Sequence, residues 1–199
     1  MVDELNHKKS INGILCQLPL PKHIDTKRVL QFVPQDKDVD CFNEKDMGNL
    51  LIGSSDYAPC TATAVVKILK SLPIDYTGLN AVVIGRSNIV GKPMAMLLLR
   101  ENGTVTITHS RTKDLKEVCK RADILIAALG KPKFITSEYV KDGAVVIDVG
   151  IHRNEQNKLC GDVDFDDVID KVSAITPVPG GVGPMTIAML MNNCVETVR

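Results

Sequence analysis

A seven-residue turn, GRSNIVG at 85–91, joins an apolar run to a helical pattern and has the composition of a phosphate-binding loop. Glycine lets a ligand approach the backbone closely, and amides at a helix N-terminus attract anions. The match to the dinucleotide pattern G-x-G-x-x-G is imperfect, because Ser87 replaces the second glycine and Gly91 comes one residue late. We therefore predict a dinucleotide site here, with a purely structural strand-to-helix turn as the alternative.

The residues after the next apolar run indicate which dinucleotide fits. An NAD site usually has Asp or Glu about 20 residues past the glycine turn, where it accepts hydrogen bonds from the ribose 2′-hydroxyl. This chain instead has His109, Ser110 and Arg111. A hydroxyl and a guanidinium suit a 2′-phosphate, and Arg86 in the turn offers a second guanidinium. The sequence thus favours NADP over NAD, unless both arginines are solvated surface residues.

A second loop, PVPGGVGPMT at 177–186, contains three prolines and three glycines. Proline stiffens such a loop, and glycine leaves its amides bare. The loop is either a flat wall for a ligand or only a break before the last helix.

Alternating strands and helices are expected to position these residues. The segment 80–102 has the pattern of a strand, a glycine turn and a helix with Pro93 in its first turn. An apolar run at 12–20 ends in prolines. Further strands without polar alternation are expected at 104–110, 123–130 and 144–150, and helices at 25–33 (capped by Asp25 or Thr26), 60–72 and 185–199. Strands buried on both faces predict an α/β fold, a Rossmann-like doubly wound parallel sheet covered by helices.

Composition excludes several classes of protein. The 24 acidic and 24 basic side chains balance and are scattered, so we expect no nucleic-acid or membrane-surface partner. Apolar runs are too short for a membrane span, and MVDELNHKK does not resemble a signal peptide. Six cysteines without a C-x-x-C pair are expected to be reduced, which points to a cytoplasmic protein. Four dispersed histidines form no metal motif, so no metal is expected.

Several segments together resemble the methylenetetrahydrofolate dehydrogenase/methenyltetrahydrofolate cyclohydrolase family, and the resemblance covers essentially all 199 residues. It implies hydride transfer from 5,10-methylenetetrahydrofolate to NADP⁺ and hydrolysis of the methenyl product to 10-formyltetrahydrofolate. It also implies a homodimer of two-domain α/β chains. The matching segments are GILCQLPLP (13–21), KDVD (37–40), PCT (59–61), VVIGRSNIVGKPMA (82–95), VVIDVGI (145–151), GDVDF (161–165) and ITPVPGGVGPMTIAML (175–190).

The resemblance also assigns residues. It implies that Gln17 hydrogen-bonds the catalytic lysine and that Asp40 pairs with the pterin ring. Folate is expected between the domains, with the glycine loop as a wall of the cleft. The implied folate contacts are Gln17, Pro19, Asp40, Pro179, Gly180 and Gly181. The implied NADP contacts are Gly85, Arg86, Ser87, Ser110 and Ile151, to which the charge argument above adds Arg111.

The resemblance suggests three segments: residues 1–65 as the remainder of an incomplete folate domain, 66–178 as the NADP domain, and 179–199 as a loop and helix returning to the folate domain. The family's lysine lies in a Tyr-x-x-x-Lys segment that these 199 residues do not contain. Cys41 stands where the family usually has glycine, and Ala62 and Ala64 replace a proline and a glycine. The alternatives are therefore a non-catalytic NADP-binding remnant or interaction module of the same family and, less favoured, an oxidoreductase for another substrate.

Overall fold

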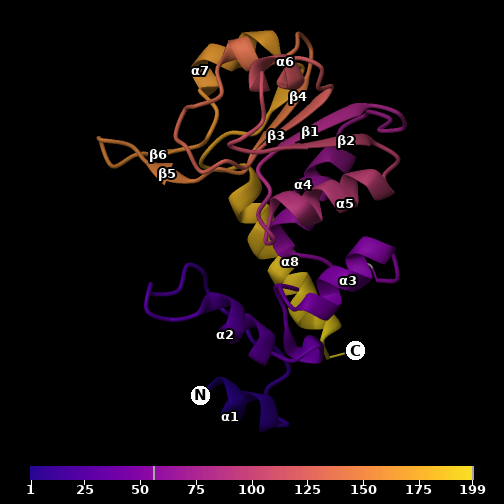
Figure 1. Cartoon of the computed structure of the whole chain (residues 1–199), viewed down its shortest axis with the longest axis vertical. Coiled ribbons are helices and arrows are strands. Elements are labelled where there is room, and N and C mark those ends of the chain that lie inside the picture. Colours follow the sequence, from indigo (N-terminus) through magenta and orange to yellow (C-terminus); the bar gives the residue numbers. More distant parts are fainter. Residues whose placement is uncertain (56, 199) are drawn as a thin grey trace.

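A parallel sheet organises the upper half of the molecule in the computed structural model, which describes residues 1–55 and 57–198 (Figure 1). Its strand order is β2-β1-β3-β4-β7, and every neighbouring pair is parallel. This arrangement confirms the predicted α/β class. The strands are β1 (Asn80–Ile84), β2 (Thr104–Thr108), β3 (Ile124–Ala127), β4 (Val145–Asp148) and β7 (Ala174–Ile175), and β5 (His152–Arg153) pairs antiparallel with β6 (Leu159–Cys160).

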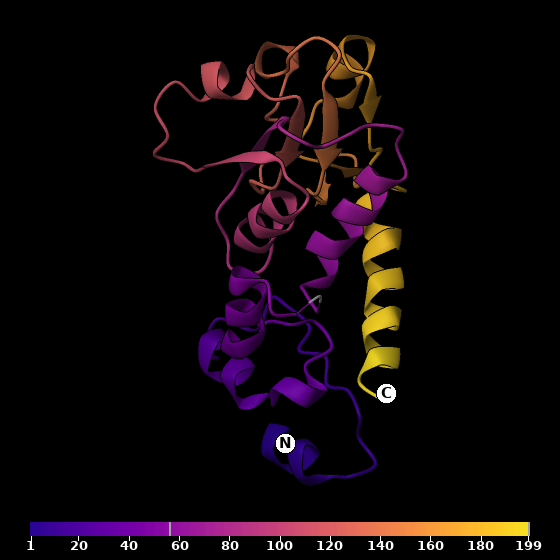
Figure 2. The same cartoon turned by 90° about the vertical axis from the view of Figure 1, so that its right-hand side faces the viewer.

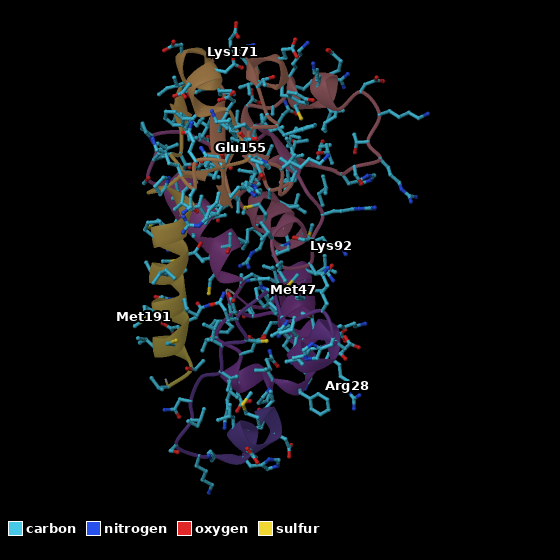
Figure 3. All side chains as sticks on the ribbon, turned by 90° about the vertical axis from the view of Figure 1, so that its left-hand side faces the viewer. Arg28, Met47, Lys92, Glu155, Lys171 and Met191 are labelled. Carbon is cyan, nitrogen blue, oxygen red and sulfur yellow. The ribbon has the colours of Figure 1, made fainter. Side chains whose placement is uncertain are left out.

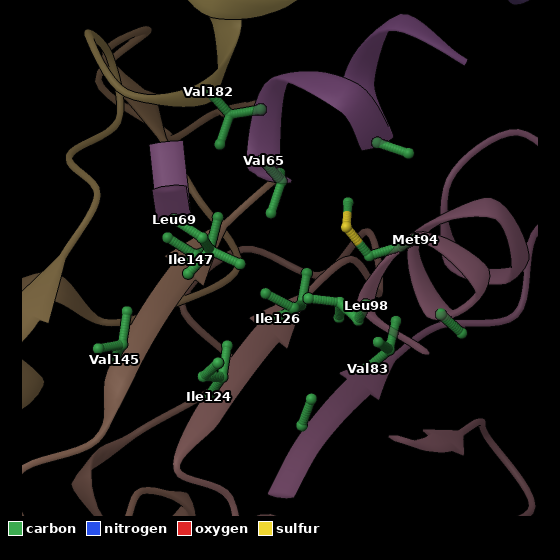
Figure 4. Close-up of a cluster of buried hydrophobic side chains, with 13 residues drawn as sticks. Val65, Leu69, Val83, Met94, Leu98, Ile124, Ile126, Val145, Ile147 and Val182 are labelled. Atoms are coloured by element: carbon green, nitrogen blue, oxygen red, sulfur yellow. The ribbon is translucent and has the colours of Figure 1, made fainter. Parts of the chain in front are cut away.

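Both faces of the sheet are covered, as a doubly wound fold requires. On one face, α4 (Cys60–Lys70) and α5 (Gly91–Arg100) contribute Val65, Leu69, Met94 and Leu98 to a cluster with Ile126 and other strand residues (Figure 4). On the other face, Cys119 of α6 (Leu115–Cys119) and Val168 of α7 (Phe165–Val168) pack against alternate strand residues. Burial of this apolar surface is the main stabilising term for the sheet.

The edge strand β2 corrects one prediction. The segment 104–110 was expected to be buried on both faces, but most of its residues are exposed and only Thr108 is buried. β2 pairs with β1 alone, so its other edge meets solvent. Thr104 and Thr106 suit this position because their exposed hydroxyls meet solvent, whereas the buried hydroxyl of Thr108 donates to the Val83 carbonyl at 3.3 Å.

The helices lie close to their predicted ranges, with different ends. Helix α2 (Thr26–Phe32) is capped by Asp25, whose carboxylate accepts a hydrogen bond from the Arg28 amide at 3.2 Å. Helix α8 (Val182–Glu196) begins inside the glycine loop rather than at residue 185, and the predicted end at residue 199 lies outside the described residues. Helices α1 (Val2–His7) and α3 (Glu44–Ile52) and the 3₁₀ helices Gln35–Lys37, Ser137–Tyr139 and Ile169–Lys171 were not predicted.

The lower half of the molecule in Figure 1, formed mainly by residues 1–55 and 57–59, contains no strand. The apolar run 12–20 forms only an isolated bridge from Ile14 to Asp38, because no neighbouring strand lies beside it. Helix α8 runs from the sheet toward this half (Figures 1 and 2) and packs against α4. The outer side of α8 is apolar and exposed, and Figure 3 shows Met191 there, 61% exposed.

Candidate functional site

Two cavities open at the carboxyl edge of the parallel sheet, which is where α/β proteins bind ligands. The first cavity has a volume of about 410 Å³ and the second about 580 Å³. The turn between β1 and α5 borders both, because Gly85 to Ser87 line the first cavity and Val90 lines the second. One ligand with two halves can therefore span the turn.

The geometry of this turn explains its glycine. Gly85 has a φ of +132°, and a Cβ there would overlap the carbonyl oxygen of Ala128 after β3. The Ser87 Oγ accepts hydrogen bonds from the amides of Val90 at 3.1 Å and Gly91 at 3.3 Å. Ser87 therefore caps the start of α5 from within the loop.

The first cavity brings together most of the predicted NADP residues. Gly85, Arg86, Ser87 and Ser110 all line it, and Arg86 and Ser110 have exposed side chains. Arg111 does not line this cavity; its amide donates to Nδ1 of His109 at 3.2 Å. A hydroxyl and a guanidinium at the ends of β1 and β2 can bind a 2′-phosphate, so the cavity fits the adenosine half of NADP.

The second cavity brings together the predicted loop and Ile151. Pro179, Gly180 and Gly181 line it along one side, and the residues after β4 line the other. Gly181 is closely packed, since a Cβ there would lie 2.5 Å from the carbonyl oxygen of Pro177. The loop is therefore a bare wall of a largely apolar cavity, and a flat ring can lie against such a wall.

The remaining predicted folate residues do not line either cavity. Gln17 is exposed, and its Nε2 donates to the adjacent Leu18 carbonyl at 3.2 Å. Pro19 is exposed and follows a cis peptide bond. Asp40 is half-buried; burial raises the pKa of its carboxyl, while hydrogen bonds from Cys60 lower it. Asp40 nevertheless lies near the second cavity, because Thr61, the next residue after Cys60, lines that cavity.

The unusual residues of this half are accommodated in the core. Cys41 adopts a φ of +58°, the left-handed region that glycine favours, at a cost of about 1 kcal/mol. Its sulfur is buried and lies 3.7 Å from Nδ2 of Asn193 in α8, and burial raises the pKa of its thiol. Ala62 and Ala64 are also buried in α4 and do not line the second cavity. All six cysteines are free thiols.

Several cavity residues were not predicted from the sequence. His109, Thr112, Leu129 and Lys131 line the first cavity, and Asp148 lines the second. Burial raises the pKa of the Asp148 carboxyl, although three backbone amides donate to it. Each of these residues lies at or after the carboxyl end of a parallel strand. That position was the signal that could have identified them.

Two further features of the described residues concern metal ligands and membrane-spanning helices. No group of three or more His, Cys, Asp or Glu side chains is arranged to bind a metal there. No helix in residues 1–55 and 57–198 is long and apolar enough to cross a membrane.

Comparison with known proteins identifies the family. Residues 59–199 match the tetrahydrofolate dehydrogenase/cyclohydrolase NAD(P)-binding domain, and residues 1–40 match the catalytic domain of the same family. Bifunctional protein FolD of Agathobacter rectalis is 63% identical over the whole chain, which covers 71% of that protein. FolD of Listeria innocua is 57% identical over the whole chain, which covers 70% of it.

Solved structures agree with this result. The crystal structure of the bifunctional enzyme FolD from Campylobacter jejuni has a TM-score of 0.95 and 49% identity, covering 98% of this chain and 70% of that one. The Trypanosoma brucei enzyme, complexed with NADP cofactor and inhibitor, has a TM-score of 0.92 and 39% identity, covering 98% of this chain and 69% of that one. The chain therefore belongs to the tetrahydrofolate dehydrogenase/cyclohydrolase family.

Proposed function

We propose that this chain carries the NADP site and part of the folate site of an enzyme that oxidises 5,10-methylenetetrahydrofolate and hydrolyses the product to 10-formyltetrahydrofolate. The observation that supports this most is the pair of cavities on either side of the β1–α5 turn. NADP⁺ is the hydride acceptor in the proposed reaction. The two cavities offer room for its two halves and for a substrate ring beside the nicotinamide.

Each cavity has a distinct task in this proposal. Arg86 and Ser110 bind the 2′-phosphate of the adenosine half, and Gly85 lets the backbone approach the diphosphate. In the second cavity, Gly180 and Gly181 provide the wall against which the nicotinamide and the folate lie. A fixed wall places the methylene carbon near the hydride acceptor, and such positioning lowers the barrier to transfer.

The folate side of the site is the less complete part. Asp40 is proposed to accept hydrogen bonds from the pterin ring, since it is hydrogen-bonded to Cys60, whose neighbour Thr61 lines the second cavity. Gln17 is proposed to orient the catalytic lysine of the family. Gln17 is exposed and its Nε2 donates to the carbonyl of the adjacent Leu18, so its amide oxygen can accept a hydrogen bond from such a partner.

A second candidate function is NADP binding without turnover. It is favoured by one observation, namely that most of these residues, 59–199, match the NAD(P)-binding domain of the family, whereas only residues 1–40 match its catalytic domain. Hydrolysis of the methenyl cation needs a base to activate water, and positioned proton transfer contributes about 10²–10⁴-fold.

Two assays separate the candidates. The chain would be titrated with NADP⁺ by calorimetry and then mixed with methylenetetrahydrofolate to follow NADPH formation. Loss of methenyltetrahydrofolate absorbance against buffer would report hydrolysis. Binding with both turnovers supports the enzyme, binding alone supports the module, and absence of NADP⁺ binding would refute both.

A matched pair of variants tests the folate assignment. Thr61 lines the second cavity, whereas Thr63, two residues later, bonds backbone carbonyls of its own helix region. Thr61→Val is expected to weaken binding of tetrahydrofolate severalfold and to leave NADP⁺ affinity unchanged. Thr63→Val is expected to leave both affinities unchanged. Equal tetrahydrofolate affinities in Thr61→Val and wild type would contradict the placement of folate.

The assembly, location and domain limits belong to the same proposal. A homodimer follows from the family resemblance, and sedimentation at several concentrations tests it. A cytoplasmic location is proposed from the six free thiols.

The proposed domain boundary after residue 65 lies within α4. This helix packs on the sheet, and Cys60 at its start is hydrogen-bonded to Asp40. Limited proteolysis would show whether residues 66–178 are a separate unit.

A further inference from the structure

A buried carboxylate and an imidazole connect the loops that border the two cavities. Asp162 is fully buried, and its Oδ1 lies 2.7 Å from Nε2 of His152. Neither residue lines a cavity, and neither has a part in the function proposed above. Burying a carboxylate is costly unless several donors satisfy it, so the contacts of Asp162 indicate what it stabilises.

Most of those contacts are to the loop after β3. The amides of Leu129 and Gly130 donate to Oδ2 of Asp162 at 2.7 and 3.1 Å, and the Lys131 amide donates to Oδ1 at 2.8 Å. Three successive amides thus converge on one internal anion, in the arrangement that other proteins use for bound phosphates. Leu129 and Lys131 line the first cavity, so Asp162 fixes part of its wall from behind.

The same loop also touches the glycine turn. The Ala128 amide donates to the Ile84 carbonyl at 2.9 Å, and the Ala128 carbonyl occupies the space that a Cβ on Gly85 would need. A shift of residues 129–131 would therefore be transmitted to the turn that borders both cavities. The hydrogen bonds to Asp162 hold residues 129–131 in place only while each backbone amide keeps its acceptor.

Asp162 is also connected to the second cavity. Its amide donates to Oδ1 of Asp148 at 2.9 Å, and the Gly150 amide donates to the same oxygen at 2.9 Å. Asp148 and Gly150 line the second cavity, as does Ile151, the neighbour of His152. The loops after β3 and β4 are thus held by one hydrogen-bonded network centred on Asp162.

We propose that Asp162, oriented by His152, is a positioning residue that holds the 129–131 wall where the adenosine half of NADP requires it. The inference rests on the proposed function, because it takes NADP to be the ligand of the first cavity. Asp162 acts through backbone amides and does not touch the ligand.

Asp162→Asn tests the proposal most directly. The amide nitrogen of asparagine places a donor against backbone donors, so the 129–131 wall loses at least one acceptor. Affinity for NADP⁺ and for 2′,5′-ADP, which carries only the adenosine half, is expected to fall at least about tenfold. Asp164→Asn is the matched control, because Asp164 is two residues away and pairs with Lys133 at the surface, 2.9 Å apart. Its affinities are expected to stay within about twofold of wild type.

Variants of His152 keep the test valid if Asp162→Asn does not fold. The His152 side chain is 21% exposed, so His152→Ala removes one hydrogen bond to Asp162 and leaves the three amide bonds. NADP⁺ affinity is expected to fall about threefold, a smaller loss than in Asp162→Asn. His152→Gln can donate from Nε2 to the same oxygen and is expected to restore most of the affinity.

The outcomes distinguish positioning from stability alone. Melting temperatures without ligand would be measured for every variant. Weaker 2′,5′-ADP binding by folded Asp162→Asn, with rescue by His152→Gln, supports the proposal. Wild-type affinity in folded Asp162→Asn, or in His152→Ala, would overturn it even where the melting temperature falls. A wild-type protein that binds neither NADP⁺ nor 2′,5′-ADP would instead overturn the proposed function on which it rests.

Discussion

Replacing Arg86 and Arg111 one at a time tests which guanidinium recognises the 2′-phosphate. Both arginines were predicted from the sequence as NADP ligands, yet only Arg86 lines the first cavity. Arg111 is exposed, and its amide donates to Nδ1 of His109. We expect Arg86→Ala to lower NADP⁺ affinity while Arg111→Ala leaves it nearly unchanged.

The size of the effect follows from exposure. A hydrogen bond to a charged group contributes about 1.5–3 kcal/mol, which corresponds to roughly 10- to 150-fold in affinity. Arg86 is exposed, so solvent and salt screen its interaction with phosphate. The lower end of this range of affinity changes therefore applies, and we expect Arg86→Ala to bind NADP⁺ about tenfold more weakly than wild type. NAD⁺ lacks the 2′-phosphate, so its affinity should change less than about twofold.

Calorimetric titration of wild type, Arg86→Ala and Arg111→Ala with NADP⁺ and NAD⁺ measures these affinities. Wild type should bind NADP⁺ at least about tenfold more tightly than NAD⁺. Raising the salt concentration should reduce the difference between wild type and Arg86→Ala, because the lost interaction is ionic. An equal loss for both dinucleotides in Arg86→Ala, or the larger NADP⁺ loss in Arg111→Ala, would refute the reasoning.

Three other predictions concern stability and redox state. Ser87→Ala removes the hydroxyl that caps α5 and should lower the free energy of unfolding by about 1 kcal/mol in urea titrations, whereas Asn88→Ala, which loses only an exposed bond to a lysine, should change it by less than about 0.5 kcal/mol. Burial raises the pKa of Asp46 to about 6, although Gln35 donates to it. Ionisation of Asp46 therefore opposes folding as the pH rises. The free energy of unfolding of Asp46→Asn, measured in urea, should increase relative to that of wild type by about 1–3 kcal/mol between about pH 4 and pH 7. A difference that does not grow with pH contradicts this. Unfolded protein alkylated without reductant should show six modified thiols by mass spectrometry, and fewer would indicate disulfides.

The sheet and the cofactor turn were predictable because local signals and tertiary structure agree there. The run 81–84 is apolar and buried throughout, and β1 is a central strand with neighbours on both sides. Gly85 and Pro93 mark the end of that strand and the first turn of the next helix, as expected from their backbone preferences. The edge strand β2 was harder, because exposure depends on strand order, which no single segment encodes.

The substrate side was less predictable for a different reason. The placement of Gln17 and Asp40 depends on contacts between segments far apart in the sequence, such as the bridge from Ile14 to Asp38. The network around Asp162 is a stronger example, since its four partners come from residues 129–131 and from His152. A sequence pattern identifies buried acids only weakly, and their partners become known only from the fold.

The two departures of the turn from G-x-G-x-x-G have one structural cause. Ser87, at the place of the second glycine, accepts the amides of Val90 and Gly91, and the late glycine lets the helix begin beside this cap. Those two amides already have an acceptor, so a diphosphate at this turn must use other donors. A hydroxyl that accepts two bonds still has its own hydrogen to donate, so the Ser87 side chain can offer one of those donors. We therefore propose that the Ser87 hydroxyl takes over part of the usual backbone contact with the diphosphate, while Arg86 is left to the 2′-phosphate.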